Sequence, residues 1–453
     1  MTGSIGTISL ITKTGEFERK YFLNNPDITF FKSVYRKHTN FSKYFKTDNL
    51  APVGSTELQQ NKDIQTGSED LLAKIYLENK ITIKKTTADA ALLIFANLGS
   101  NFIENNDDEA LSITIGNNRA VFKSGGLFQE VKGELLNQMS LTFHSGSGTH
   151  APELELNPDT YDISCKSGTH YNYTTLSGGV RGITIPNASF NDNDTIQTEY
   201  FYTIPEFSFM KDYGLALPLL SMRNDTIKFN VKFKPKEKLI SDPDGGFHLT
   251  YESNLIQELI QLDNDEKSRF LTSQLNYLTE SVTRIDISSK TQDVKSAFKL
   301  CKYILMVGKP NEDNSNFSAS NSLTTPSELK LKSFNINIGG NPLYPAVIRL
   351  NKEIFTKMNI NKYFPGCGRD LNAGSTTSEN HGQLDSIGMV PFSIEPLNYT
   401  QPSGCISNQG QIGAIKLDIE TKDLETTDPN MILYAINYNI LQIADGKSQI
   451  QFH

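Results

Sequence analysis

Hydrophobic and polar residues alternate along several stretches of this chain, and this period of two limits the fold more strongly than any other feature. It is clearest in DLLAKIYLENKITI at 70–83, IKFNVKF at 227–233 and LYAINYNIL at 433–441. Successive side chains of an extended chain point to opposite sides, so alternation predicts strands with one buried face. The predicted buried faces are Leu71, Ala73, Ile75 and Leu77; Ile227, Phe229, Val231 and Phe233; and Tyr434, Ile436, Tyr438 and Ile440.

Helical spacing is rarer. Apolar residues recur every three or four positions at 127–139 and at 347–358, which predicts two amphipathic helices. Acidic residues open the stretch 263–278 and favour the start of a third short helix there. The regions 145–199, 308–328 and 366–388 are rich in Ser, Thr, Gly and Asn and are expected to be long surface loops. The pattern as a whole predicts antiparallel β structure, as a sandwich or a barrel.

The chain also contains an internal repeat. ITIGNN at 113–118 is echoed by INIGGN at 336–341, and the longer segment 204–233 is echoed by 390–420. Several motifs repeated in one order predict a tandem duplication of a β unit, with its seam near the charged stretch 234–246. The residue pairs predicted to occupy equivalent strand positions are Ile113 with Ile336 and Ile227 with Ile415.

Six segments carry a family resemblance that spans nearly the whole chain. They are NNPDITFFKSVYRKHTNF (24–41), DLLAKIYLE (70–78), LALPLLSMRNDTIKFNVKF (215–233), LDNDEKSRFL (262–271), QPSG (401–404) and LYAINYNIL (433–441). In this order they resemble the major capsid protein of the nucleocytoplasmic large DNA viruses. The signature residues, for which the resemblance implies a structural role, are Asn25, Pro26, Ile28, Phe30, Phe31, Tyr35, Arg36, His38, Asn40, Phe41, Pro218, Leu219, Gln401, Pro402, Ser403, Gly404, Tyr434, Asn437 and Tyr438.

The resemblance implies an all-β chain of two tandem eight-stranded antiparallel jelly rolls with a few short helices in the connections. Together with the repeat, it divides the chain into a lead-in at 1–24, a first jelly roll at 25–235, a linker at 236–246 and a second jelly roll at 247–453. It further implies a homotrimeric capsomer of pseudo-hexagonal outline in the icosahedral outer shell of a virion, assembled in the host cytoplasm. The expected partners are neighbouring capsomers, minor capsid proteins and the internal viral membrane.

The segment 24–41 is basic in an otherwise acidic chain. The net charge is −8, to which residues 1–46 contribute +5 and the remainder −13. This balance argues against a general nucleic-acid binder, although a nucleic-acid arm or a membrane-surface segment would also combine basic and aromatic residues. Because Ile28, Phe30 and Val34 fall on alternate positions, we interpret the segment as a structural lead-in that docks its aromatic residues under the first jelly roll.

Neither membrane insertion nor secretion is expected. The chain has no run of about 18 apolar residues, and its first 20 residues lack the basic start and apolar core of a secretory signal. Cys165, Cys301, Cys367 and Cys405 lie far apart and form no CxxC pair. This spacing predicts four free thiols in a reducing compartment, with Cys165 and Cys301 differing in reactivity.

No motif indicates an enzyme or a cofactor. GKS at 446–448 ends like a phosphate-binding loop, but the glycine that such a loop needs at position 441 is Leu. Ion sites around 144–170 are conceivable, although unrelated loop residues are the simpler interpretation. The residues concerned are His144, His150, Cys165 and His170 for zinc, and Glu153, Glu155, Asp159 and Asp162 for calcium.

Two alternative functions stay open at this point. A minor capsid paralogue would share the fold and all six segments. A glycan-binding jelly-roll protein would need exposed aromatic residues in its long loops, and Tyr161, Tyr171 and Tyr173 are the candidates. The duplication favours the major capsid interpretation, because two similar units in each of three chains give six similar corners for a hexagonal lattice.

Overall fold

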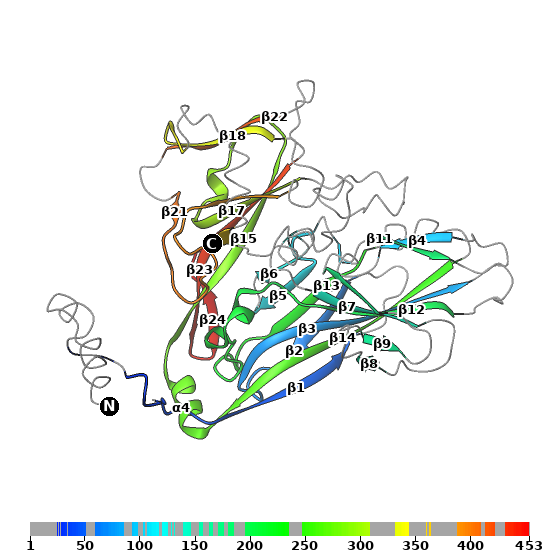
Figure 1. Cartoon of the computed structure of the whole chain (residues 1–453). Coiled ribbons are helices and arrows are strands. Elements are labelled where there is room, and N and C mark those ends of the chain that lie inside the picture. Colours follow the sequence, from blue (N-terminus) through cyan, green and yellow to red (C-terminus); the bar gives the residue numbers. More distant parts are fainter. Residues whose placement is uncertain are drawn as a thin grey trace, which may run out of the picture. The chain divides into compact units, whose positions relative to one another are not determined.

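The computed structural model describes residues 41–50, 59–85, 107–116, 120–125, 195–234, 247–308, 331–343, 387–408, 413–421 and 431–452, and shorter stretches within 25–40, 93–104, 128–184 and 359–363. The chain divides into two units, 1–40 and 41–453. Strands dominate the second unit, all of their pairings are antiparallel, and α4 (Asn264–Thr272) is the one α-helix with bounds in the described residues (Figure 1). The all-β prediction is confirmed.

Two sheets enclose the core of the first half of this unit. The larger has the order β1-β14-β3-β12-β7-β10, and the smaller has the order β2-β13-β5-β6. Their strands are β1 (Phe41–Asn49), β2 (Gln59–Ile64), β3 (Leu71–Lys85), β5 (Leu111–Ile115), β6 (Ala120–Lys123), β7 (Met139–Ser145), β10 (Tyr171–Thr175), β12 (Thr195–Thr203), β13 (Ile227–Lys232) and β14 (Phe247–Leu262). Leu77, Ile113, Phe229 and Leu255 are among the residues buried between them.

The second half repeats this arrangement. One sheet has the order β15-β23-β17-β20, and the other has the order β16-β22-β18-β19. Their strands are β15 (Leu275–Ile287), β16 (Thr291–Asp293), β17 (Leu300–Gly308), β18 (Leu331–Ile338), β19 (Asn341–Pro342), β20 (Ile387–Pro391), β22 (Ile415–Thr421) and β23 (Met431–Ala444). Ile304, Phe334, Leu417 and Leu433 belong to the core of this half.

The two halves share one strand order. In each larger sheet the first strand lies beside the last, and in each smaller sheet the second strand lies beside the next to last. This is the order of a jelly roll. The first half has additional strands, namely β7 and β10 in its larger sheet, β4 (Leu93–Asn97) paired with β11 (Val180–Thr184), and β8 (Leu154–Leu156) paired with β9 (Ile163–Cys165). In the second half, β21 (Ile406–Ser407) and β24 (Lys447–Ile450) are added.

The register of the smaller sheets repeats as well. In the first roll Ile227 pairs with Ile115, and in the second Ile415 pairs with Ile338. Ile113 and Ile336 therefore occupy equivalent positions, as the repeat predicted, and so do Ile227 and Ile415. Strands β5 and β18 are each followed by a glycine with positive φ, Gly116 at 67° and Gly339 at 58°. Their amides donate to equivalent carbonyls, those of Thr226 at 2.8 Å and Ala414 at 3.1 Å.

The predicted buried faces are confirmed for β13 and only in part for two other strands. Ile227, Phe229, Val231 and Phe233 are all fully buried. In β3 the register with β14 shifts by one residue at Ala73, so Leu71 and Ala73 pack in a separate outer cluster while Ile75 and Leu77 face the core. Placing all four residues on one face was therefore wrong, because a bulge reverses the alternation.

Strand β23 was predicted to be half-buried, and this prediction was also wrong. Residues 431–439 are all buried. One face of the strand belongs to the core of the second roll, and the other face packs in a cluster with Phe128 and Val131. A covering element on each side leaves no exposed face, which the local pattern of residues does not reveal.

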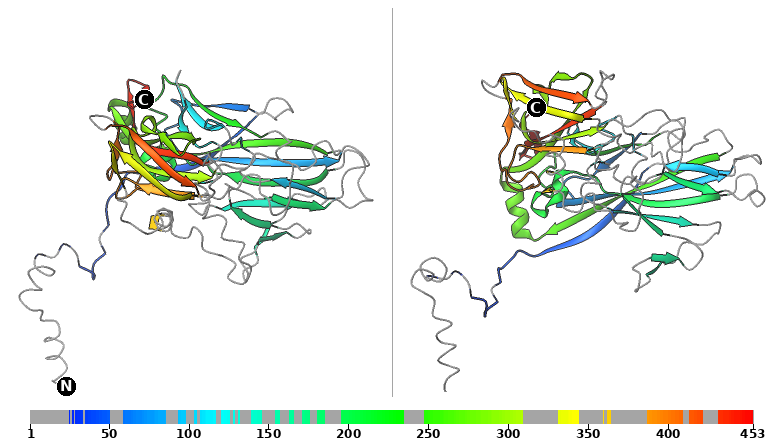
Figure 2. Two further views of the ribbon diagram at one scale, coloured as in Figure 1. Left: turned by 90° about the horizontal axis from the view of Figure 1, so that it is seen from above. Right: turned by 45° about the horizontal axis from the view of Figure 1, so that its top comes forward.

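Strand β14 lies with the first roll. It pairs with β1 along Phe41–Asn49 and with β3, and Figure 2 shows these long strands running side by side. The expected boundary after residue 246 falls at the start of this strand. The helix predicted at 263–278 is present as α4, whose first turn is capped by the Asp263 carboxylate accepting from the Glu266 amide at 2.9 Å. The helix ends at Thr272, and β15 begins at Leu275.

Other expected elements fall largely outside the described residues. Of the helix predicted at 127–139, Phe128 and Val131 are helical and buried, but Met139 already begins β7. The helix predicted at 347–358 lies outside the described residues. The region 145–199 was expected to be loop, yet it contains β8 to β11 and the start of β12.

The core of the first roll makes a direct prediction. Phe229→Ala should lower the free energy of unfolding by about 3–5 kcal/mol, because it leaves a cavity at a fully buried position. Lys228→Ala is the matched control on the exposed face of the same strand, and it should change stability by less than about 0.5 kcal/mol. Urea unfolding followed by circular dichroism measures both, and equal effects of the two changes would contradict the assigned face of β13.

Candidate functional site at the junction of the two rolls

The second roll packs part of its larger sheet into the core of the first roll. Leu441 and Ile443 of β23 are buried in that core, and Leu275, Tyr277 and Ile450 pack against it. The last strand of the second roll and its hairpin partner β24 thus complete a hydrophobic core built mainly by residues far earlier in the chain. Burial of this kind joins the two rolls by the hydrophobic effect.

The hairpin between β23 and β24 is held by polar contacts from the first roll. Its turn contains Asp445 and Gly446, both with positive φ. The Asn224 amide donates to the Gly446 carbonyl at 2.9 Å, and the Asn224 side chain donates to the Asp445 carbonyl at 3.0 Å. Asp225 accepts from the Ser448 amide and hydroxyl, both at 2.6 Å. The GKS stretch is therefore a structural turn, in keeping with its lack of the phosphate-loop glycine.

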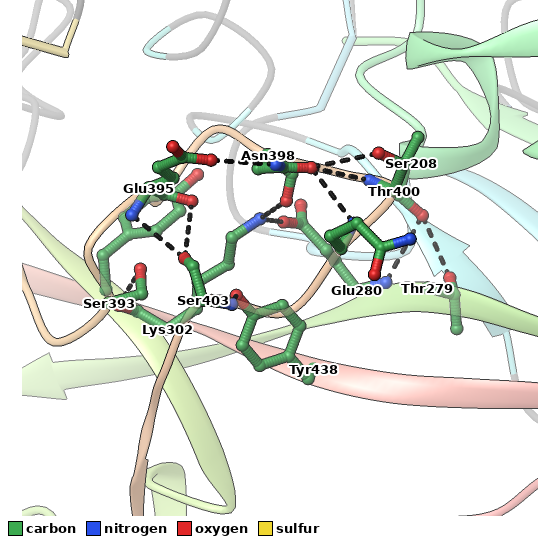
Figure 3. A network of polar contacts seen from close by, with 12 residues as sticks. Ser208, Thr279, Glu280, Lys302, Ser393, Glu395, Asn398, Thr400, Ser403 and Tyr438 are labelled. Carbon is green, nitrogen blue, oxygen red and sulfur yellow. Dashed lines mark hydrogen bonds and ion pairs between the residues drawn. The ribbon is translucent and has the colours of Figure 1, made fainter. Parts of the chain in front are cut away.

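A buried lysine of the second roll lies in a polar network beside the junction (Figure 3). The side chain of Lys302 is fully buried, and its ammonium group donates to Glu280 Oε1 at 2.6 Å and to the Asn398 carbonyl at 2.9 Å. It also lies over the rings of Tyr399 and Tyr438, at 4.7 and 5.2 Å from their centroids. A buried ammonium is tolerated only when its charge and its donors are satisfied, as they are here.

Ser208 connects the first roll to this network. Ser208 lies in the short 3-10 helix η3 (Ser208–Lys211), and its hydroxyl shares a 2.9 Å hydrogen bond with the Thr279 hydroxyl. The same hydroxyl accepts from the Glu280 amide at 3.3 Å. Thr279 and Glu280 belong to β15, so these contacts connect the first roll to the strand that carries the partner of Lys302. Connected buried hydrogen bonds favour one arrangement of their elements.

The QPSG segment belongs to a loop that folds over Lys302. The Lys302 carbonyl accepts from the amides of Phe392 and Ser393 at 2.9 and 3.1 Å. The Asn398 side chain accepts from the amides of Thr400 and Gln401 at 3.1 and 3.0 Å. Hydrogen bonds within the loop and its tight turn thus fix it over the buried charge.

The signature residues Ser403, Gly404 and Tyr438 meet in this loop. The Ser403 amide donates to the Tyr438 hydroxyl at 3.2 Å, and the Ser403 hydroxyl donates to the Glu395 carbonyl at 3.1 Å. Gly404 has a φ of 115°, a conformation that other residues rarely adopt. Two segments that the sequence analysis singled out separately, QPSG and LYAINYNIL, are thus in contact.

Four further signature residues have structural positions nearby or in the cores. Asn437 is fully buried, and its side chain donates to the Ala297 carbonyl at 3.0 Å and accepts from the Lys299 amide at 3.0 Å. Tyr434 is buried with its ring 5.4 Å from that of Phe128. Pro218 and Leu219 form a buried turn beside the first core. Gln401 and Pro402 are exposed.

The N-terminal signature residues do not form the predicted buried strand face. The described residues of 25–40 contain no strand. Phe30, Phe31 and Tyr35 are 90%, 99% and 85% exposed, and the docking of these aromatic side chains under the first roll stays a prediction. Asn25, Arg36, His38 and Asn40 are exposed as well, Phe41 is half-exposed at the start of β1, and Pro26, Ile28 and Val34 lie outside the described residues.

The candidate ion-binding and glycan-binding side chains around 144–173 lie outside the described residues or in strands whose side chains are not described. Within the described part of the chain, no group of three or more His, Cys, Asp or Glu is placed to hold a metal ion. Nor does a helix there have the length and apolar character to cross a membrane. Cys301 is buried and Cys405 is exposed, and both are free thiols.

The residues that sequence reasoning missed are Lys302, Glu280 and Ser208. A signal existed for the first, because LCKYILMVG contains a single charged residue in an otherwise apolar strand. A lysine in such a run is either an error of strand assignment or a buried, paired charge. Glu280 and Ser208 lie in polar surroundings in the sequence, and nothing local distinguishes them.

The junction also perturbs the titration of tyrosines. Burial raises the pKa of Tyr399 well above its usual value, and the neighbouring carboxylates of Glu280 and Glu206 raise it further. Burial alone raises the pKa of Tyr277 to about 12. Because Tyr277 belongs to the second roll and packs against the core of the first, its titration reports on the junction.

Comparison with known proteins identifies the family. The family model of the major capsid protein N-terminus matches residues 29–259, just over half of the chain. The chain belongs to the major capsid protein family. It is 23% identical over 445 residues to the major capsid protein of Pyramimonas orientalis virus, which covers 95% of this chain and 96% of that protein. It is 24% identical over 294 residues to capsid protein 1 of Acanthamoeba polyphaga mimivirus, which covers 62% of this chain and 44% of that protein.

Solved capsid structures share the fold of this family member. PBCV-1 VP54, as fitted into a reconstruction of the virophage Sputnik, superimposes with a TM-score of 0.59 at 16% identity, covering 94% of this chain and 100% of that chain. The Faustovirus major capsid protein gives a TM-score of 0.52 at 11% identity, covering 93% and 94% of the two chains. These likenesses confirm the predicted double jelly-roll fold.

Removal of the buried ammonium should destabilise the protein strongly. Lys302→Ala leaves the Glu280 carboxylate without its partner, and we expect a loss of about 3–5 kcal/mol in the free energy of unfolding. Lys80→Ala is the control, because the pair Lys80–Glu252 has the same chemistry at 3.1 Å but is solvent-exposed, and it should cost less than about 1 kcal/mol. Denaturant titration compares the two variants, and similar losses would contradict the importance assigned to Lys302.

Alkaline pH should weaken the junction. The folded pKa of Tyr277 is about 12, whereas an unfolded tyrosine titrates near 10, so the stability that depends on its neutral form is present below pH 10 and is lost as the pH rises towards 12. Tyr277→Phe cannot ionise, and its unfolding free energy should fall less between pH 10 and 12 than that of the unmodified protein. Tyr35→Phe, at an exposed position, is the control and should leave the pH profile unchanged.

Proposed function

We propose that this protein is a structural subunit of the outer capsid of a large DNA virus and that three copies form one capsomer. The observation that carries this proposal is the strand order and register shared by the two rolls. Two similar rolls in each of three chains supply six similar units, which suits packing in a hexagonal lattice. The relatives named above are capsid proteins, which supports the same role for this chain.

Association into a closed ring follows from the chemistry of identical chains. A head-to-tail contact repeated around three copies closes without leaving an open end. A permanent interface of this kind buries more than about 2,000 Å² and is apolar at its centre. The hydrogen bonds that Ser208, Asn224 and Asp225 make with the second roll support this role, because they hold both rolls of a copy in one arrangement before neighbours bind.

The pairing of the strands supports a revised division of the chain within this proposal. The first roll would extend from Phe41 to Leu262, α4 would connect the rolls, and the second roll would extend from Leu275 to Phe452. The signature residues of QPSG and of β23 would then serve a structural role, that of fixing the loop over Lys302. Their hydrogen bonds to one another and to backbone groups support that role.

The proposed place of the protein is the virion, with assembly in the host cytoplasm. Its proposed partners are further copies of itself, neighbouring capsomers, minor capsid proteins and the internal viral membrane. We propose no catalytic activity, no cofactor and no specific nucleic acid. The acidic balance of residues 47–453, at −13, supports the exclusion of nucleic acid as a specific partner.

Light scattering on the purified protein tests the assembly. We expect a particle with three times the chain mass of 50.6 kDa, and this mass should persist on dilution because an obligate interface of this size dissociates slowly. Glycan arrays provide the comparison with the lectin alternative. A persistent monomer that binds immobilised glycans would overturn the capsid proposal.

A further inference from the structure

A hollow of about 640 Å³ lies where the two rolls meet. Residues of β5 and β6 line it from the first roll, and residues of β15, β23 and β24 line it from the second. Its apolar wall consists of Ile115, Val121, Val282, Leu441, Ile450 and Phe452. Binding pockets in proteins have volumes of about 300–1,000 Å³ and mainly apolar walls, so this hollow has the size and lining of a binding site.

The mouth of the hollow is acidic. An adjoining hollow of about 560 Å³ shares Asp108, Lys123 and Arg284 with the first and is lined in addition by Asp107, Glu109 and Asp286. Four carboxylates thus face these two basic groups, and a third basic group, Lys232, pairs with Asp107 at 3.2 Å. The side chains of Glu109 and Asp286 are 52% and 55% exposed, so the acidic groups are accessible from solvent.

Three basic groups leave one of the four negative charges unbalanced. Lys123 binds Glu109 at 2.6 Å, and Arg284 binds Asp286 at 2.9 Å, whereas the nearest approach of Arg284 to Asp108 is 3.6 Å. Burial raises the pKa of Asp108 although Arg284 and Lys123 act in the opposite direction. A further cation at the mouth would therefore be stabilised, because it would compensate a partly buried carboxylate.

The same chain carries a segment with the complementary chemistry. FFKSVYRK at 30–37 contains three basic residues and no acidic residue. Phe30, Phe31 and Tyr35 are 90%, 99% and 85% exposed, an arrangement that is unfavourable in water and typical of an interaction site. Aromatic side chains that enter a pocket, flanked by charges that match its rim, are the usual anchors of protein interfaces.

We propose that the segment 30–37 of a second copy binds at this hollow, with its phenylalanines inside and its basic residues against the acidic mouth. The contact deepens the proposed function and rests on it, since it requires copies that meet in an assembly. Segment and hollow are different surfaces of one chain, so the contact is head-to-tail and links each copy to the next. The acidic mouth favours this partner over an anionic lipid surface, which it would repel.

Site-specific photo-crosslinking tests the contact. The photoreactive residue p-benzoylphenylalanine replaces Phe31, and equal amounts of ¹⁵N-labelled and unlabelled protein are assembled, irradiated and digested. We expect crosslinked peptides of mixed isotope content that join residue 31 to β15 or β24, near Val282 or Ile450. The same probe at Tyr213, which is 46% exposed, is the control and should not reach these strands.

Two variants should abolish the crosslink in different ways. Val282→Arg fills the hollow with a charged side chain, and it should reduce crosslinking at least tenfold, whereas Ile394→Arg at an 81% exposed position should leave it unchanged. In a second series the probe replaces Tyr35, and Phe30→Ala with Phe31→Ala removes the anchors. These two changes lie at exposed positions, so they leave the core intact and should produce the same loss.

Light scattering on the same samples separates the two proposals. If the unmodified protein forms no trimer, the proposed function is overturned, and the contact is overturned with it. An intact trimer whose crosslinks fall within one isotope class, or on other surfaces, would overturn the contact alone. A lipid partner would also overturn the contact. This result would be seen if the isolated peptide of residues 28–41 bound phosphatidylserine vesicles as strongly as the whole chain does, and if these vesicles competed with assembly.

Discussion

Strand β23 contributes side chains to three hydrophobic clusters, and the junction of the two rolls depends on it. Its successive residues alternate between the core of the second roll and the cluster on the opposite face of the same sheet, and its far end enters the core of the first roll. The residues concerned are Met431, Leu433 and Ala435; Ile432, Tyr434 and Ile436; and Leu441 and Ile443. Because a hydrogen-bonded strand is stiff, packing at one end restrains the other, and two similar rolls behave as one subunit.

The apolar contacts of the junction stabilise it, whereas its polar groups make one arrangement of the neighbouring elements more favourable than others. Lys302 and Glu280 form a buried pair whose attraction is offset by the cost of removing both charges from water. Such a pair adds little net stability, but any shift of β15, β17 or the 392–404 loop would leave a charge without its partner. We infer that the pair selects one arrangement of these elements.

The buried face of a strand was predicted correctly where the local pattern of residues reflects everything that packs against that strand. Strand β13 has one covered face, and its alternation was predicted correctly; the repeated glycines after Ile115 and Ile338 likewise mark equivalent turns. Reasoning failed where distant elements decide the outcome. The bulge at Ala73 and the second cover on β23 both depend on neighbours that local periodicity does not contain. Of the candidate site, QPSG and Tyr438 were identified, whereas Glu280 and Ser208 carried no local signal.

The central claim is that two equivalent rolls, fixed to one another through β23, form a subunit of a threefold particle. A cryo-electron microscopy map of the purified protein tests it most directly. We expect a particle of three chains with six similar roll densities, in which β23 runs without a break from the core of the second roll into that of the first. Single chains whose two rolls adopt variable relative orientations would contradict it.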